Sequence, residues 1–204
     1  LEFRRVLFRS DRYLVAAEHI GVEAALVLNK ADLLNDAFWP EQLEQYAALG
    51  YRTLTTHHGM PDGSDLASLI GTSTVVLVGQ SGVGKSSLIQ RLLPDASIRV
   101  GALSELADKG RHTTTTAELF HLPNGGRLID SPGVREFGLA HVTATDIARG
   151  FREFSPFLGH CRFRDCHHEQ EPDCALRAAV DEGSISEARF ESYRQIRQSV
   201  ADTS

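Results

Sequence analysis

The sequence predicts an α/β fold with a mostly parallel sheet, followed by a small helical domain. Over about the first 140 residues, short apolar segments of strand length alternate with amphipathic segments of helical period, which is typical of parallel sheets. A glycine-rich loop, 79-GQSGVGKSS-87, joins one such strand to one such helix. After about residue 140 the strand-type segments end, and a cysteine cluster stands at 161–174.

Composition excludes several classes of protein. Hydrophobic residues make up 42% of the 204 residues and charged residues 24%, as in globular proteins with a real core. No apolar run approaches the roughly 20 residues of a membrane helix, so we expect no membrane association. The net charge of −6 excludes a uniformly basic nucleic-acid binder, although it permits a local basic patch such as 162-RFR-164.

The three cysteines indicate a compartment and a kind of site. An odd, tightly spaced set argues against a secreted disulfide framework. We therefore expect a cytoplasmic, monomeric protein with a metal site at Cys161, Cys166 and Cys174. Residues 1–10, LEFRRVLFRS, lack the apolar centre and cleavage site of a signal peptide. We interpret them as a non-native scar, with an unknown length of chain missing upstream.

The predicted elements define two domains. We expect residues 11–142 to form the first domain and residues 143–204 a helical domain. The helices of the first domain are expected at 11–21, 40–50, 64–71 (with Ser64 as N-cap) and 85–93. Its strands are expected at 22–29, 51–56 and 74–79, of which the first should be buried, with a hairpin formed by 117–122 and 127–130. In the second domain, Gly183 should separate two helices and Ser186 should cap the second.

The glycine-rich loop matches the phosphate-loop pattern G-x-x-x-x-G-K-[ST] in full. Backbone N–H groups of such a loop, with the N-terminus of the next helix, surround a phosphate group. Lys85 would place a cation against the β- and γ-phosphates, and Ser86 a hydroxyl on Mg²⁺. The nucleotide-binding residues predicted here are Gly79, Gln80, Ser81, Gly82, Val83, Gly84, Lys85, Ser86 and Ser87.

A second motif, 29-NKAD-32, has the pattern of a guanine-reading loop. The Asp32 carboxylate can accept hydrogen bonds from guanine N1–H and N2–H₂, whereas adenine offers no such pair of donors. The stem of Lys30 can cover the base, and Asn29 can tie this loop to the phosphate loop. Residues 55-TTHH-58 stand where a second base-contact loop is expected, without its usual Ser-Ala.

Two further motifs concern the γ-phosphate. Asp130 begins 130-DSPG-133 and would reach Mg²⁺, while the Gly133 N–H would face the γ-phosphate. Residues 99–116 read as a long loop that ends in a threonine run. Thr114, or alternatively Thr113, is expected to give Mg²⁺ a second hydroxyl.

The order of these motifs predicts a circularly permuted P-loop GTPase domain, because the base reader precedes the phosphate loop. The position after DSPG, where many GTPases carry a water-orienting glutamine, is Val134. A replacement is needed for hydrolysis, and His112 in the long loop is the best candidate.

The cysteine cluster predicts a closed zinc site. Three thiolates and one imidazole make a tetrahedral Zn²⁺ site without an open position, so the ion is expected to be structural. His160, His167 and His168 all compete for the fourth place on the residues alone. The arginines Arg189, Arg194 and Arg197 are expected on the wet face of the last helix, where they either form a solvated face or contact RNA.

Taken together, NKAD, GQSGVGKSS, GRHTTTT, DSPG and the cysteine cluster, in that order, resemble the RsgA/YjeQ family of circularly permuted bacterial GTPases. The resemblance covers about residues 11–200. It implies His168 as the fourth zinc ligand, support for His112 as the catalytic residue, and contact with RNA. It also implies that this chain lacks the family's N-terminal oligonucleotide-binding domain.

The function implied is hydrolysis of GTP to GDP during late maturation of the 30S ribosomal subunit, stimulated by the ribosome. The expected partners are GTP and GDP, the 30S subunit and 16S rRNA, with one Zn²⁺ and Mg²⁺ as cofactors. Two alternatives remain open. One is a zinc-bearing RNA-binding nucleotide switch with little hydrolysis; the other is an ATP-dependent P-loop enzyme, against which NKAD argues.

Overall fold

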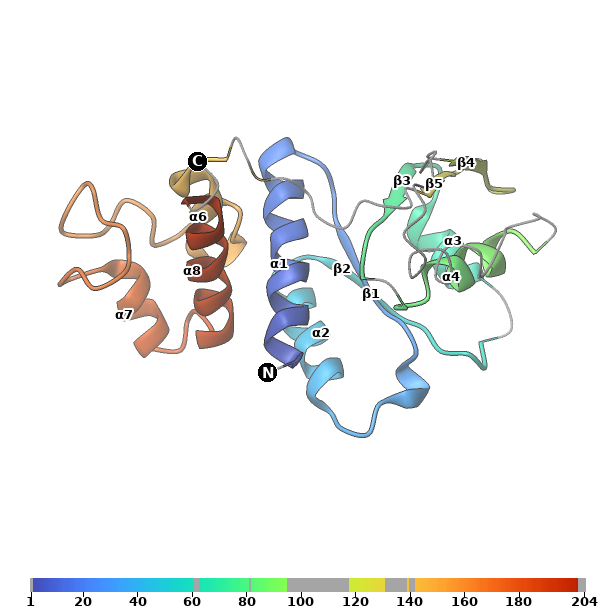
Figure 1. Ribbon diagram of the computed structural model, residues 1–204, viewed down its shortest axis with the longest axis horizontal. Helices are drawn as coiled ribbons and strands as arrows, with labels where there is room; N and C mark the ends of the chain where they lie inside the picture. Colours follow the sequence, from blue (N-terminus) through green and yellow to red (C-terminus); the bar gives the residue numbers. More distant parts are fainter. Residues whose placement is uncertain are drawn as a thin grey trace, which may run out of the picture. The chain divides into compact units, whose positions relative to one another are not determined.

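The computed structural model describes residues 2–60, 63–80, 82–94, 118–130, 139 and 142–201 (Figure 1). The chain forms two compact units. One consists of Ala25–Glu136, and the other combines Leu1–Ala24 with Phe137–Ser204. Within the described ranges, no helix is long and apolar enough to cross a membrane.

The unit Ala25–Glu136 contains the strands. Pairing is parallel between β1 and β2 and between β3 and β5, while β4 runs antiparallel to β5. The mostly parallel α/β arrangement and the predicted hairpin are therefore confirmed. In chain order the elements are β1 (Ala25–Leu28), the 3-10 turn η1 (Ala31–Leu33), α2 (Phe38–Ala48), β2 (Arg52–Thr55), α3 (Ser64–Ile70), β3 (Thr74–Leu77), α4 (Lys85–Leu92), β4 (Glu118–His121) and β5 (Arg127–Asp130).

The core of this unit holds the strand ends in place. Helices α3 and α4 contribute Leu66, Ile70, Leu88, Ile89 and Leu92, which are buried with Leu122 and Leu128. Val27, Leu54, Val75 and Leu77 of the strands pack against them. The register pairs Leu28 with Thr55 and Leu77 with Asp130. The two strands of each parallel pair therefore end at the same position along the sheet. The loops that leave these ends carry the predicted motifs.

Two local predictions for this unit need correction. Strand β1 was expected to be buried, but its side chains are exposed at Ala25 and half-buried from Leu26 to Leu28. Helix α3 was expected to have Ser64 as its N-cap, but Ser64 is its first residue and Gly63 is the cap.

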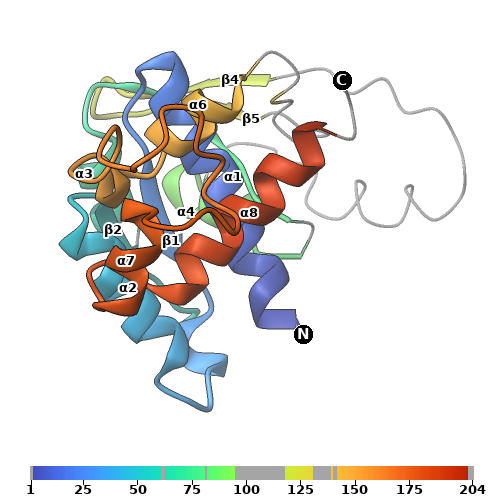
Figure 2. The ribbon, with the colours of Figure 1, turned by 90° about the vertical axis from the view of Figure 1, so that its left-hand side faces the viewer.

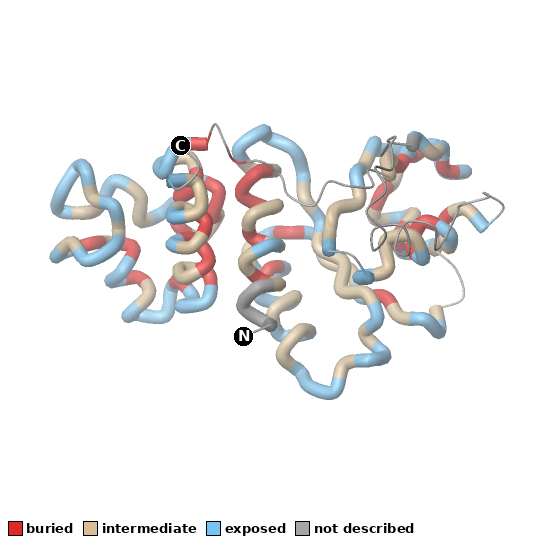
Figure 3. The backbone as a smooth tube through the Cα atoms, in the orientation of Figure 1, coloured by how far each residue is buried: buried red, intermediate tan, exposed pale blue. Residues whose placement is uncertain are grey.

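The second unit is helical. It consists of α1 (Glu2–Ile20), α6 (Ala144–Arg149), the 3-10 turn η3 (Arg152–Phe154), α7 (Ala175–Asp181) and α8 (Glu187–Ala201). Helices α1 and α8 lie side by side (Figures 1 and 2). The fully buried ring of Phe151 stacks on Phe154 at 4.8 Å between centroids, and Tyr193 meets both edge-on. Figure 3 shows this core as buried bands along α1 and α8.

Helix α1 differs from the helix predicted at 11–21. It begins at Glu2, with Leu7 buried and Phe8 packed against the core of the helical unit. Gly150 allows close packing there, because a Cβ on it would lie 2.8 Å from Val15 Cγ1. This packing groups α1 with the helices after residue 142 rather than with the strands. The functional division at residue 142 and the origin of residues 1–10 stay predictions.

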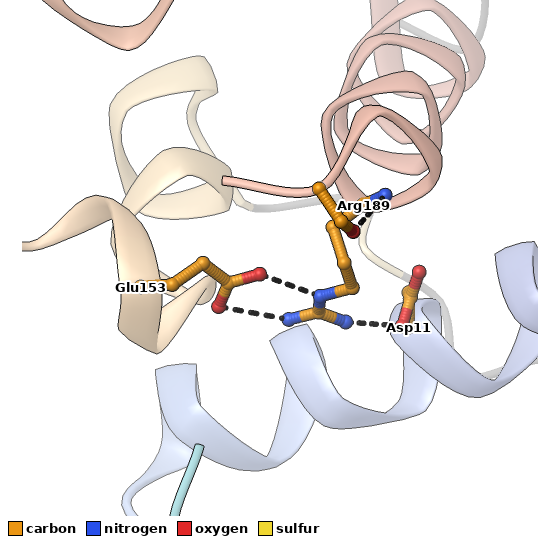
Figure 4. Close-up of polar contacts among 4 residues, drawn as sticks. Asp11, Glu153 and Arg189 are labelled. Carbon is orange, nitrogen blue, oxygen red and sulfur yellow. Dashed lines mark hydrogen bonds and ion pairs between the residues drawn. The ribbon is translucent and has the colours of Figure 1, made fainter. Parts of the chain in front are cut away.

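The helices after the cysteine cluster follow the prediction in part. The break near Gly183 and the cap are confirmed, since the N–H of Arg189 donates to Ser186 Oγ at 3.3 Å. The prediction for Arg189 itself is wrong. Its side chain is 9% exposed and is inserted between Asp11 of α1 and Glu153 of η3 (Figure 4). Of the three arginines, only Arg194 is exposed.

Candidate functional site

The predicted phosphate loop follows β3 and leads into α4. Gly84 is the N-cap of α4, with a left-handed φ of 96°. The Lys85 ammonium lies back against the loop, donating to the carbonyls of Gly79 at 2.7 Å and Gln80 at 3.0 Å. Burial lowers the pKa of Lys85, and the negative charge of Asp130 opposes that shift. The loop therefore presents a cation and a helix N-terminus, the chemistry of an anion site.

The loop Asn29–Asp32 follows β1 and is joined to the phosphate loop by two side-chain hydrogen bonds. Asn29 Nδ2 donates to the carbonyl of Val83 at 2.9 Å, as the sequence predicted for Asn29. Lys30, held in the left-handed region at φ 59°, donates from Nζ to the carbonyl of Gly82 at 2.7 Å. Segments more than fifty positions apart thus form one site, although their order along the chain is reversed.

The contact between the two loops explains the glycine at position 84. A Cβ placed on Gly84 would lie 2.3 Å from Asn29 Nδ2. A side chain at position 84 would therefore force the Asn29 amide to move, and the left-handed φ independently favours glycine. Position 84 therefore combines two requirements, the turn into α4 and the close approach of the base-reading loop.

Residues 55–58 border the loop Asn29–Asp32 on another side. Ala31 N–H donates to the carbonyl of Thr56 at 3.1 Å, and His58 N–H donates to Asp32 Oδ1 at 3.3 Å. The exposed carboxylate of Asp32 is thereby oriented by a backbone N–H. This placement agrees with the role predicted for 55–58 as a second base-contact loop, although its residues lack the usual Ser-Ala.

The structure leaves part of the predicted site untested. Asp130 closes β5 and is near enough to influence Lys85, and Ser86 and Ser87 lie in the first turn of α4. The other predicted residues fall outside the described ranges, namely Ser81, His112, Thr113, Thr114 and Gly133.

The cysteine cluster converges as a metal site requires. The ligand atoms of Cys161, Cys166, His168 and Cys174 all lie within 4.8 Å of one another. His168 Nδ1 is 3.4 Å from Cys161 Sγ and 3.3 Å from Cys174 Sγ, and those two sulfurs are 3.9 Å apart. Tetrahedral ligands at zinc bond lengths are roughly 3.5–3.8 Å apart. The donor set and its spacing therefore fit one tetrahedral ion, and His168 rather than His160 or His167 joins it.

Two side chains that the sequence did not assign to the metal site hold the loop around His168. The carboxylate of Glu171 accepts N–H bonds from His167 and Glu169 at 2.8 Å and from Gln170 at 3.1 Å. The His167 N–H and its neighbours lower the pKa of Glu171. Arg197 of α8 donates to the His167 carbonyl and to Glu169. His168 has a left-handed φ of 61°, and this arrangement fixes the loop that carries it.

The family model for the RsgA GTPase matches residues 5–140. Two curated relatives, each named small ribosomal subunit biogenesis GTPase RsgA, come from Chromohalobacter salexigens and Pseudomonas putida. The first is 58% identical over 189 residues, which cover 91% of this chain and 56% of the relative. The second is 56% identical over 200 residues, which cover 95% of this chain and 58% of the relative. The chain thus spans a little over half the length of these relatives.

Two solved structures have a similar fold. YjeQ from Thermotoga maritima matches with a TM-score of 0.75 at 30% identity, over 95% of this chain and 66% of that one. YloQ, described as a circularly permuted GTPase, matches with a TM-score of 0.72 at 26% identity, over 97% of this chain and 63% of YloQ.

Proposed function

Because the chain belongs to the RsgA GTPase family, we propose that it hydrolyses GTP to GDP and phosphate during late maturation of the 30S ribosomal subunit. The observation that carries the proposal is the pair of hydrogen bonds from Asn29 and Lys30 to the phosphate loop. They bring the base reader and the phosphate binder together in one circularly permuted nucleotide domain.

The base specificity of the site rests on Asp32. Its carboxylate is exposed at the end of the loop that carries Asn29 and Lys30. Guanine would donate N1–H and N2–H₂ to this carboxylate, and the stem of Lys30 would cover the base. Adenine would leave the carboxylate facing an acceptor, N1, so ATP should bind far more weakly.

The phosphates would lie on the loop Gly79–Gly84 and against the Lys85 ammonium. The residues present fit a magnesium ion, since Ser86 offers a hydroxyl and Asp130 a carboxylate near Lys85. When bound, Mg²⁺ would neutralise charge on the phosphate oxygens. Thr114 or Thr113, and the N–H of Gly133, complete our assignment around the γ-phosphate.

Hydrolysis requires a water molecule in line with the γ-phosphorus. We assign its orientation to His112, because Val134 has no group that could do so. The oxygen of water forms the new bond to phosphorus, the bond to the bridging oxygen breaks, and the electron pair stays with GDP. One proton of the water stays on the phosphate that forms, and the other passes to solvent. Slow intrinsic turnover, accelerated when the ribosome positions His112, follows from this assignment.

The cluster of Cys161, Cys166, His168 and Cys174 would hold one structural Zn²⁺. With four protein ligands it has no open position for a substrate. Its role would be to stabilise a helical unit that carries contacts to 16S rRNA. We further propose a monomeric protein that acts in the cytoplasm, in keeping with the ribosomal role in its relatives' names.

Two measurements test this function. Competition of GTP and ATP against a fluorescent GDP measures base choice, and single-turnover hydrolysis of labelled GTP with and without 30S subunits measures catalysis. We expect GTP to be preferred and 30S subunits to accelerate hydrolysis. Equal binding of ATP would favour an ATP-dependent enzyme. Tight GTP binding without hydrolysis under either condition would favour an RNA-binding switch.

A further inference from the structure

We propose that Thr56 is a positioning residue of the guanine site, which fixes the side-chain amide of Asn29 and so holds the base-reading loop against the phosphate loop. This inference rests on the proposed function, since it concerns how the same site binds guanine nucleotides. It gives a specific role to one residue of the segment 55–58, which was expected only as a second base-contact loop without its usual Ser-Ala.

Thr56 is anchored where β2 ends. It is 3% exposed, its N–H donates to the carbonyl of Leu28 at 2.8 Å, and its own carbonyl accepts the N–H of Ala31 at 3.1 Å. These two backbone bonds place Thr56 beside both ends of the Asn29–Lys30 dipeptide. Its hydroxyl donates to Asn29 Oδ1 at 2.8 Å. The hydroxyl therefore sits in a fixed position rather than on a freely moving loop.

The hydrogen-bonding groups around Asn29 determine which way its amide points. The carbonyl of Val83 can only accept, so the Nδ2 group of Asn29 must face it. Asn29 Oδ1 then faces Thr56 and needs a donor, which only the hydroxyl supplies in this pair. The order of donation is thus Thr56 to Asn29 to Val83. Loss of the Thr56–Asn29 hydrogen bond therefore removes the restraint that directs Asn29 Nδ2 toward the Val83 carbonyl.

The space around the amide makes its orientation consequential. Asn29 Nδ2 is so close to Gly84 that a Cβ there would lie 2.3 Å away. The amide consequently cannot rotate without changing its contact with the phosphate loop. Lys30 supplies a second connection through Gly82, so removal of the hydroxyl should loosen the junction of the two loops rather than abolish it.

Such a junction should matter for ligands that contact both loops. GDP would contact the base reader and the phosphate loop together, and its affinity depends on their relative position. Pyrophosphate would contact the phosphate loop alone. A positioning role for Thr56 therefore predicts weaker GDP binding with unchanged pyrophosphate binding, whereas general damage to the unit would weaken both.

The experiment compares Thr56→Val, which keeps the shape and removes the donor, with Thr56→Ser, which keeps the donor. In the full chain, fluorescent GDP should bind roughly three- to tenfold more weakly to Thr56→Val, the scale of one buried hydrogen bond. Thr56→Ser should bind GDP like the unchanged protein. Pyrophosphate, tested as a competitor of the fluorescent GDP, should have the same dissociation constant in all three proteins. Should Thr56→Val not fold, Thr56→Cys, a weak donor of similar size, takes its place with the same expected loss.

A double-mutant cycle tests whether Thr56 acts through Asn29. In an Asn29→Ala background, Thr56→Val should cause no further loss of GDP affinity. A full additional loss in that background, or equal GDP affinity of Thr56→Val and the unchanged protein, would overturn the positioning role. An unchanged protein that binds ATP as well as GDP would instead overturn the proposed function.

Discussion

Asp11 and Arg189 form a buried ion pair between α1 and α8, although 178 positions separate them in the sequence. The same guanidinium donates to both carboxylate oxygens of Glu153 (Figure 4). It also lies over the Phe151 ring, with Cζ 4.5 Å from the ring centroid. One arginine thus serves two buried carboxylates on different elements. Removing it would leave both negative charges in the core without their shared partner.

We therefore expect Arg189→Ala to destabilise the helical unit strongly. Breaking a buried ion pair by removing one partner typically costs about 3–5 kcal/mol, because the remaining charge stays desolvated. The measurement is the free energy of unfolding in urea, followed by helical circular dichroism. Arg194→Ala is the matched control, since Arg194 lies on the same helix in an exposed pair with Glu191. Similar costs for the two variants would contradict a structural role for the triad.

Gly84→Ala should abolish guanine nucleotide binding. The added Cβ would lie 2.3 Å from Asn29 Nδ2, and the backbone has a φ of 96° that alanine disfavours. Affinity for a fluorescent GDP provides the measurement. Gly183→Ala is the control, because its φ is also left-handed at 77° but no atom lies within 4 Å of the new Cβ. It should cost about 1 kcal/mol of stability and leave binding intact. Retained GDP affinity in Gly84→Ala would contradict the close contact.

Asp32→Asn should change base preference rather than eliminate binding. Xanthine carries a carbonyl where guanine carries its amino group, and an asparagine amide can donate to that carbonyl while accepting N1–H. We expect the variant to lose GDP affinity by roughly 100-fold or more and to gain affinity for XDP, as expected when a buried polar contact is mismatched. Competition between GDP and XDP measures the exchange. An equal loss for both nucleotides would contradict a base-reading role.

His112→Ala should separate binding from catalysis. Val134, the residue that follows DSPG, has no group to orient water, so loss of the proposed imidazole should lower 30S-stimulated hydrolysis by roughly 100-fold or more. GTP affinity should stay as it was, because His112 is not assigned to the base or the phosphate loop. His121→Ala, an exposed histidine on β4, is the control. Unchanged stimulated turnover in His112→Ala would remove it from the mechanism.

Features that depended on neighbouring residues could be predicted from the sequence. The phosphate loop, the hairpin β4–β5 and the Ser186 cap are each specified within a few positions, and the structure contains all three. The Asn29 bond to the phosphate loop was predictable because two motifs with known roles needed one nucleotide. The metal site was predictable because three cysteines lie within fourteen positions, whereas only the family resemblance favoured His168 as the fourth ligand.

Features that depend on distant partners were not predictable. Arginine on a helix is usually solvated, and nothing near Arg189 in the sequence indicates that Asp11 lies beside it. The grouping of α1 with α8 has the same cause, because the amphipathic pattern of a helix does not identify its partner. Thr56 was missed because residues 55–58 lack the Ser-Ala signature, while the hydroxyl that matters is revealed only by its contact with Asn29.

The proposed zinc site should make the pH dependence of stability opposite with and without metal. Burial raises the pKa of the Cys166 thiol from 9.0 to about 12, and it also raises that of Cys174. In the metal-free protein, the folded state therefore holds these protons more tightly than the unfolded state. The resulting stability is fully present below about pH 9 and is lost as pH rises towards 12.

Zinc requires thiolates, so the loaded protein should instead become less stable as pH falls and protons displace the ion. Urea unfolding of the chelated and zinc-loaded protein across this pH range, followed by helical circular dichroism, measures both trends. Parallel trends in the two samples would contradict ligation by these thiols.

The contact between Glu171 and the loop that carries His168 yields the last prediction. Its carboxylate accepts three backbone N–H groups, so Glu171→Ala should free the loop and weaken zinc binding. Residues that orient metal ligands typically change affinity by roughly 10- to 100-fold. Competition with a chromogenic zinc chelator gives the affinity, and Glu182→Ala, at the exposed end of α7, is the charge-matched control.

Because the Glu171 carboxylate is not a ligand, the coordination spectrum of a cobalt-substituted protein should keep its tetrahedral, three-sulfur character in Glu171→Ala. A changed spectrum would mean that Glu171 acts on ligand identity rather than on the position of the loop.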